Sequence, residues 1–218
     1  MTSRRWVEPV TLTGDVVRLD PLSLEHLPAL TTVGLEADIW RWMPRQVNSP
    51  GDMRAYVEAA LDACTAGTEM PFATIDQATG RVIGTTRYMA IEPRHRRLEI
   101  GNTWLAPAWQ GTAANSEAKL LMLGHAFSVL GALRVEFKTD ALNAQSRAAL
   151  TGIGATEEGT LRRHMLTDSG RRRDSVYFSV IEEEWPHVRM HLQQRLVRLR
   201  AASGPAVPAA GDGQRDSH

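Results

Sequence analysis

The sequence predicts an α+β fold, with helices flanking a central, mostly antiparallel twisted sheet of about six or seven strands. Three short strand-forming runs follow one another between residues 70 and 105, separated by tight polar turns. A helical pattern then extends from residue 118 to residue 130. Short strands joined by tight turns and followed by a helix are typical of a layered α+β domain rather than of a closed barrel.

The N-terminal part of the chain predicts a loose start followed by small elements. We expect residues 1–9 to form a flexible arm, ahead of a strand pair at Val10–Leu12 and Val16–Leu19. Ser23 is a suitable cap for the next helix. Pro28 lies inside that helix, so the helix should be short or broken.

Two indoles stand out in the next segment, at Trp40 and Trp42. Each either closes the core or lines a binding pocket, because an indole face suits a backbone or a cation. A helix follows over residues 53–67, with its start marked by Ser49-Pro50. Cys64 falls on the apolar face of this helix, so we interpret it as a core residue and not as a nucleophile.

The meander has predicted strands at residues 70–75, 82–91 and 98–105. The second connection contains His95 among several arginines. Such a run could bind phosphate, but it is more often a solvated hairpin tip.

The stretch from Gly101 to Leu130 organises the chain. An extended run ends at Pro107, small residues follow, and a helix apolar on two sides begins. Small residues at a helix start leave backbone N–H groups accessible, at the positive end of the helix dipole. The run predicts either an anion site suited to a diphosphate or an ordinary tight turn; it consists of Gly111, Thr112, Ala113, Ala114 and Asn115.

The last part of the chain continues the alternation of strand and helix. Residues 134–140 alternate as a half-buried strand, and Asn143 can cap a short helix that Gly154 ends. Two further strands form a hairpin over residues 159–180, and a final helix covers residues 182–199. We expect one domain over residues 10–200 and a disordered tail over residues 201–218, which is rich in Gly, Pro and Ala.

Composition limits the classes of function. Basic and acidic residues balance at 25 each, so the charge does not call for a nucleic acid or an anionic membrane. The single cysteine excludes an intrachain disulfide and a cysteine-based metal cage, and we expect no metal. The N-terminus lacks the apolar stretch of a signal peptide, and no run is long enough to span a membrane. We therefore expect a cytoplasmic protein.

The order of these motifs resembles the GNAT acetyltransferases, most closely the RimJ/RimL type that acetylates ribosomal-protein N-termini. Gly111, Thr112 and Ala113 match the end of that family's Gln/Arg-x-x-Gly-x-Gly/Ala loop, although Ala108 replaces its first residue. Asn143 and Ser146 match an Asn-x-x-Ser pair of this branch. The likeness covers roughly residues 10–185 and implies a three-layer GNAT-like fold.

The resemblance implies acetyl-CoA as co-substrate and direct attack by an amine, without an acyl-enzyme. It places the cofactor along Trp104 and Leu105, against the loop and start of the helix, and beside Asn143. It also places the acceptor near Trp40, Trp42 or Tyr88. We expect acetyl-CoA and a primary amine as partners, with no membrane or nucleic acid, and leave room for a homodimer.

Glu99 is the first candidate for the general base. Its apolar neighbours Leu98 and Ile100 can raise the pKa of its carboxyl group. The alternative is an exposed strand carboxylate paired with an arginine, and Asp140 is the second candidate. Ser146 takes the position of the leaving-group acid, because a hydroxyl can donate a hydrogen bond to a departing thiolate. Asn143 either holds the pantetheine amide, caps the helix, or does both.

Three functions remain open at this level. The first is acetyl transfer to a protein N-terminus or a small amine. The second is a non-catalytic acyl-CoA-binding regulatory domain of the same fold. The third is an RNA- or ribosome-associated module, suggested by local arginine clusters and disfavoured by the neutral overall charge.

Overall fold

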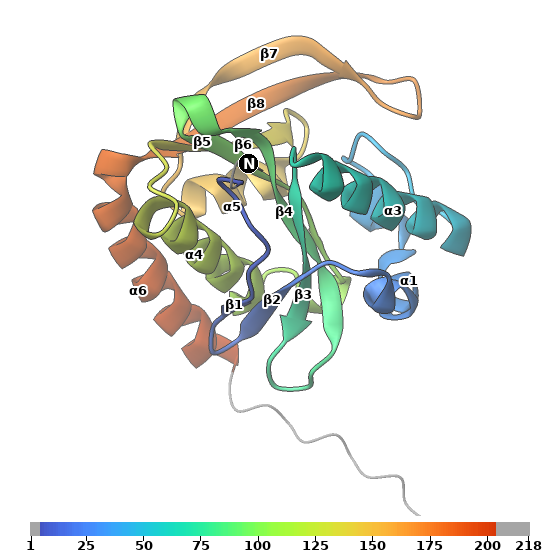
Figure 1. Ribbon diagram of the computed structural model, residues 1–218, viewed down its shortest axis with the longest axis horizontal. Coiled ribbons are helices and arrows are strands. Elements are labelled where there is room, and N and C mark those ends of the chain that lie inside the picture. Colours follow the sequence, from blue (N-terminus) through green and yellow to red (C-terminus); the bar gives the residue numbers. More distant parts are fainter. Residues whose placement is uncertain (1–4, 204–218) are drawn as a thin grey trace, which may run out of the picture.

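The computed structural model describes residues 5–203, which form one sheet of eight strands with helices on both faces (Figure 1). The order of strands across the sheet is β1-β2-β3-β4-β5-β6-β8-β7. The strands are β1 (Leu12–Thr13), β2 (Val17–Pro21), β3 (Met70–Asp76), β4 (Val82–Glu92), β5 (Arg97–Leu105), β6 (Arg134–Asp140), β7 (Thr156–Leu166) and β8 (Arg172–Ile181). The layered fold is confirmed, with one or two more strands than the sequence predicted.

The helices divide between the two faces of the sheet. They are α1 (Leu27–Gly34), α2 (Ala37–Trp40), α3 (Pro50–Ala66), α4 (Ala113–Ser128), α5 (Ala144–Gly152) and α6 (Trp185–Ser203). Residues of α4 and α6 share one apolar core with the sheet, and residues of α1, α2 and α3 share a second core on the other face. In Figure 1, α4 and α6 lie together on one side and α1 and α3 on the other.

Strands β5 and β6 run parallel and separate after only three paired residues. Their pairing covers Arg97–Glu99 against Arg134–Glu136, although each strand continues beyond that point. A bulge gives β5 one extra residue against β4 between Gly101 and Trp104. Asn102 in this bulge takes a left-handed φ of 44°. A bulge bends its strand, so β5 turns away from β6 and an opening forms between them.

Side-chain caps fix where the helices next to this opening begin. Ser49 Oγ accepts from Asp52 N at the start of α3, and Thr112 Oγ1 accepts from Ala114 N at the start of α4. Asn143 Oδ1 accepts from Ser146 N at the start of α5. Ser, Thr and Asn satisfy the otherwise free N–H groups of a first helical turn.

The β7–β8 hairpin tip meets the loop between α2 and α3. Asp168 N donates to Pro44 O at 2.9 Å, and Gln46 N donates to Asp168 Oδ2 at 3.1 Å. Segments more than 100 residues apart in the sequence therefore form a continuous covering over the opening. We call this covering the roof, defined as residues 42–46 together with residues 165–171.

The two chain ends differ from the sequence-based expectation where the structure describes them. In the expected flexible arm, Trp6 Nε1 donates to Leu130 O at 2.9 Å and Val7 is buried, so residues 5–9 are anchored by packing. In the expected disordered tail, Ala201–Ser203 belong to α6. Residues 1–4 and 204–218 of these two segments lie outside the described residues. Within residues 5–203, no helix is long and apolar enough to cross a bilayer.

Candidate active site

A cavity of about 730 Å³ occupies the opening between β5 and β6. Its walls come from the diverging halves of both strands, the starts of α4 and α5, and the roof. Side chains of α3, β4 and α6 complete it. The cavity therefore joins a helix N-terminus to the side chains of the strands in one continuous space.

The start of α4 offers backbone N–H groups to this cavity. Gly111 has a φ of 73°, and no atom lies within 4 Å of the position that a Cβ atom would take. Gly111, Thr112 and Asn115 line the cavity, and the first N–H groups of any helix lack intrahelical partners. Ala113 and Ala114 are buried beneath them and do not line it. The open space and the free donors fit a diphosphate.

Glu99 lies in the wall where the two strands separate. Its side chain is almost fully buried, and its Oε2 accepts from Lys138 Nζ at 3.1 Å. Burial raises the pKa of the Glu99 carboxyl group, and the Lys138 ammonium partly opposes that shift. The neighbouring Gly101 leaves room for the carboxylate, because Glu99 Oε1 would be 2.8 Å from a Cβ atom at that position. Glu99 is therefore a buried carboxylate facing a cavity, not an exposed strand residue.

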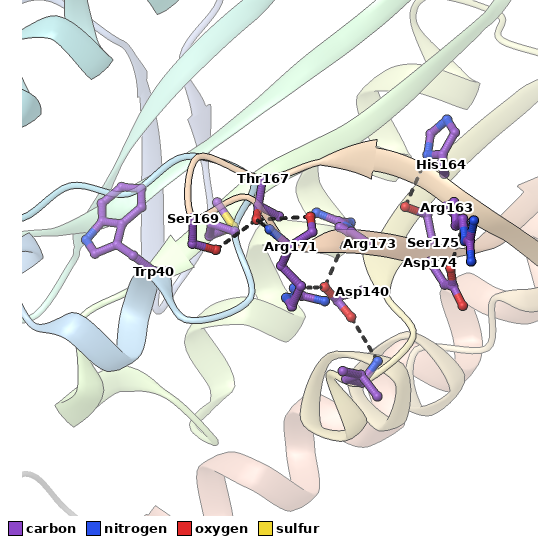
Figure 2. Close-up of polar contacts among 12 residues, drawn as sticks. Trp40, Asp140, Arg163, His164, Thr167, Ser169, Arg171, Arg173, Asp174 and Ser175 are labelled. Carbon is purple, nitrogen blue, oxygen red and sulfur yellow. Dashed lines mark hydrogen bonds and ion pairs between the residues drawn. The ribbon is translucent and has the colours of Figure 1, made fainter.

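Asp140, the second candidate base, is held differently. Its Oδ2 accepts from Arg171 and lies 3.8 Å from Arg173 Nε, and its Oδ1 accepts from Leu142 N at 2.9 Å (Figure 2). Both oxygens thus have cationic or backbone neighbours, and the side chain is fully buried. This geometry makes Asp140 an anchor for the hairpin tip and for the turn into α5.

Asn143 and Ser146 both line the cavity from the first turn of α5. The Asn143 side-chain oxygen accepts from Ser146 N at 2.9 Å, so the capping role of this residue is present. Its side-chain amide N–H groups remain available as donors. The Ser146 side chain is half-buried at the wall, where its hydroxyl group can donate to a bound molecule.

The predicted cofactor-contacting residues Trp104 and Leu105 line the cavity but bury most of their side chains. Trp104 lies 5.5 Å from the Trp40 ring, between ring centroids, inside the core under α3. Contacts of this segment with a ligand would therefore come mainly from its backbone, which β6 leaves unpaired from residue 100 onward.

The three aromatic candidates for the acceptor side lie in three different environments. Trp40 is fully buried and donates from Nε1 to Gly34 O at 2.7 Å, although it lies in the cavity wall. Trp42 is half-buried in the roof, with Arg41 and Arg171 at 5.0 and 5.6 Å from its ring centroid. Tyr88 is a correction: it is fully buried in the other core, donates to Met122 O at 2.6 Å and does not line the cavity. The alternation of β4 points it away from the opening.

Sequence reasoning did not single out three buried cations in the wall. Arg87 donates to Glu69 Oε2 at 2.7 Å, and Arg173 lies beside Asp140. Lys119 donates to Thr103 Oγ1 at 2.8 Å, and burial lowers the pKa of Lys119 to about 7. Lys119 is one of only two lysines in the chain, and the other is Lys138. That scarcity was the one available signal; the arginines are too numerous to have drawn attention.

Comparisons with known proteins find relatives of this chain in sequence and in fold. The family described as acetyltransferase (GNAT) domain matches residues 17–156. The uncharacterized N-acetyltransferase YoaA of Bacillus subtilis (strain 168) is 31% identical over 104 residues, which cover 48% of this chain and 58% of YoaA. The chain thus spans little more than half the length of that curated relative.

Two solved structures extend the likeness over most of the chain. The putative acetyltransferase from T. thermophilus is 38% identical, with a TM-score of 0.80 over 88% of this chain and 99% of that one. RimJ of Mycobacterium smegmatis, solved in complex with CoA-disulfide, is 23% identical, with a TM-score of 0.72 over 86% of this chain and 93% of that one. The second likeness concerns the fold alone.

Proposed function

We propose, from the premise that this chain belongs to the acetyltransferase (GNAT) family, that it moves an acetyl group from acetyl-CoA to a primary amine by direct attack. The observation that carries the proposal is the single cavity. It connects the N–H groups at the start of α4 with the buried carboxylate of Glu99. A phosphate-bearing donor and an amine can thus meet inside one continuous space.

The cofactor side is assigned to the start of α4. Backbone N–H groups from Gly111 to Asn115, except that of Ala114, which Thr112 caps, would hold the diphosphate, supported by the helix dipole. The backbone at Trp104 and Leu105, which lies beyond the pairing with β6, would hold the pantetheine amides, and the Asn143 amide would add a further donor. The thioester supplies the acetyl group, and Cys64 takes no part because its half-buried thiol lies outside the cavity.

The acceptor needs a base, because an alkyl amine is mostly protonated at neutral pH. Glu99 is suited to this role, since burial raises its pKa towards the working range and the cavity gives access to its carboxylate. The Lys138 ammonium favours the ionised carboxylate and so opposes that rise of the Glu99 pKa. The neutral amine then attacks the thioester carbonyl carbon, the C–N bond forms and the C–S bond breaks.

The departing thiolate accepts a hydrogen bond from the Ser146 hydroxyl group. The hydroxyl group of Ser146 faces the cavity from the first turn of α5, close to the Asn143 cap. Stabilising negative charge that develops on the leaving group lowers the barrier of the step.

Several finer assignments belong to this proposal. Membership of the RimJ/RimL branch rests on the Asn143–Ser146 spacing, a cytoplasmic location rests on the kind of protein that this branch acetylates, and homodimer formation remains open. The acceptor is either a protein N-terminus or a small amine. The catalytic unit is proposed to extend over residues 10–200, which includes α6.

An acetyl-CoA-dependent thiol-release screen over small amines and peptide N-termini tests the proposal. We expect release of CoA above the acceptor-free rate for at least one amine class, with an acetylated amine identified by mass spectrometry. Tight CoA binding without turnover on any amine would contradict the proposal and favour the non-catalytic acyl-CoA-binding domain. Salt-sensitive RNA binding without CoA binding would favour the third function.

A further inference from the structure

Arg173 of β8 is a buried cation that has no hydrogen-bond partner for its side chain among the described residues. Its side chain is 4% exposed and lies in the cavity wall. Within residues 5–203 its guanidinium makes no hydrogen bond, and Nε is buried without a partner. The nearest carboxylate oxygen, Asp140 Oδ2, lies 3.8 Å from Nε, too far for a hydrogen bond. Figure 2 shows Arg171 and Arg173 converging on this same carboxylate.

The carboxylates of this wall that are buried or half-buried are already paired with other cations; Asp38, which also lines the cavity, is exposed. Glu99 binds Lys138 at 3.1 Å, and Glu69 binds Arg87 at 2.7 Å. Asp140 accepts its hydrogen bond from Arg171. Each of the three carboxylates thus has a cation closer than Arg173, and Arg173 remains as an arginine in excess.

An arginine in this position needs an anion. Burial lowers the pKa of Arg173, but a guanidinium keeps its proton at neutral pH. A buried charge without hydrogen bonds is unfavourable, and a planar guanidinium matches a carboxylate with two parallel N–H···O bonds. Binding such a group would satisfy donors that the described residues leave free.

We propose that Arg173 binds a carboxylate carried by the acceptor, so that the acceptor is a small amino acid or an amino-acid-like compound. The proposal rests on the proposed function. Glu99 and Arg173 are close enough that each is an electrostatic neighbour of the other. The ammonium group of one small zwitterion would approach Glu99 while its carboxylate approaches Arg173.

The roof supports a small acceptor over a protein. Asp168 of the hairpin tip is hydrogen-bonded to Pro44 and Gln46, and roof residues Met43, Pro44 and Met165 line the cavity. Two segments held together beside the cavity reduce the space for a bulky acceptor there, which favours a small one.

Matched substrates test the proposal without any mutation. The thiol-release assay is run with acetyl-CoA on L-amino acids, their primary amides, the corresponding decarboxylated amines and short peptides with neutral side chains. We expect at least one free amino acid to exceed its own amide and decarboxylated amine by about 10- to 100-fold in kcat/KM, the range of a charge-assisted hydrogen bond. The amide has the less basic amine, so amine titration works against this expected result.

Arg173→Met should remove this preference. We expect kcat/KM to fall about 10- to 100-fold for the amino acid and to stay within about threefold for its amide. Arg173→Lys keeps the charge but loses the two parallel N–H donors of the guanidinium group. Its kcat/KM for the amino acid should therefore lie between those of the wild type and Arg173→Met. Arg172→Met is the matched control, because Arg172 is the exposed neighbour on the same strand. Calorimetry with CoA should give the same affinity in all four proteins.

The outcomes separate the two proposals. Equal rates on acids and amides, or a preference for neutral peptides, would overturn the carboxylate site and leave acetyl transfer intact. Weaker CoA binding in Arg173→Met would assign Arg173 to the cofactor and overturn the site as well. Failure of every amine would contradict acetyl transfer itself. If Arg173→Met does not fold, Arg173→Lys and the wild-type acid-to-amide ratio still decide the matter.

Discussion

Glu99 and Lys138 form an ion pair across the point where β5 and β6 separate. Lys138 Nζ donates to Glu99 Oε2 at 3.1 Å, and Lys138 lies two residues beyond Glu136, the last residue of β6 to pair with β5. The pair thus lies where backbone pairing ends and the cavity begins. Burial and this cation have opposite effects on the pKa of Glu99, and burial is the larger.

Removing the cation should shift the pH dependence of catalysis. In Lys138→Met, the largest influence opposing burial is lost and only the smaller one of Arg173 remains, so the pKa of Glu99 should rise further. The base must be ionised to act, so the acidic limb of the pH–rate profile should move to higher pH by about one unit. Lys138→Arg keeps the charge and should leave the limb near its wild-type position. An acidic limb that stays in place in Lys138→Met, with an acceptor whose own titration is known, would rule out Glu99 as the group responsible.

Gly111→Glu should abolish CoA binding. A side chain there would enter open space at the start of α4, and its negative charge would repel a diphosphate. Gly80→Glu is the matched control, because Gly80 also has a positive φ, with no atom within 4 Å of a Cβ position, and lies in the turn after β3. Isothermal calorimetry should show at least about a 100-fold loss in Gly111→Glu alone, since repulsion replaces several charge-assisted hydrogen bonds. Equal CoA affinity in both folded variants would place the diphosphate elsewhere.

Substitutions of Trp42 and Tyr88 should affect different properties, acceptor kinetics in the first case and stability in the second. Trp42→Ala removes a ring of the roof, and we expect the acceptor KM to rise about 2- to 30-fold, the range of a cation–π contact, with CoA affinity preserved. Tyr88→Phe removes the hydrogen bond to the Met122 carbonyl, which should lower the free energy of unfolding by about 0.5–1.5 kcal/mol, because that carbonyl keeps its place in the hydrogen-bond ladder of α4. Its acceptor kinetics should be those of the wild type. Denaturant unfolding and steady-state kinetics distinguish the two, and unchanged kinetics in Trp42→Ala would remove that ring from the acceptor site.

Ser146→Ala should lower turnover evenly across pH. The hydroxyl group serves the leaving thiolate and not the amine, so high pH should not restore the rate. The Asn143 cap uses the backbone N–H of residue 146, so the helix start is retained. We expect a loss of about 100-fold in kcat, the lower end of general acid catalysis. Single-turnover rates unchanged by the substitution would leave protonation of the thiolate to solvent.

Much of this architecture could be predicted from the sequence, because helix caps, turn residues and hydrophobic patterns all indicated the same elements. Ser49 and Asn143 each cap the helix that their residue type favours, as predicted. The meander and the final hairpin were visible from turn residues and alternation. The predicted two-sided apolar helix is also present as α4, although Val129 at its end is 70% exposed.

Long-range geometry accounts for what the sequence did not reveal. The contact of Asp168 with Pro44 joins segments that carry no mutual signal, so the roof was not predicted. Tyr88 was placed near the acceptor, but strand alternation and the β4–β5 bulge turn it into the opposite core. Arg173 is in excess because Lys138, Arg171 and Arg87 pair with the nearby carboxylates. These pairs join distant parts of the sequence, so the excess could be recognised only in the structure.

The pH–rate profile of Glu99→Gln tests the central claim most directly, with an acceptor found in the thiol-release screen and with folding and CoA affinity checked in parallel. The amide cannot accept a proton, so the rate should fall by about 10²- to 10⁴-fold. The loss should be largest at low pH, and smallest where the amine is already neutral. A variant that keeps the full wild-type profile would contradict the account, and Glu99 would then be a structural residue of β5.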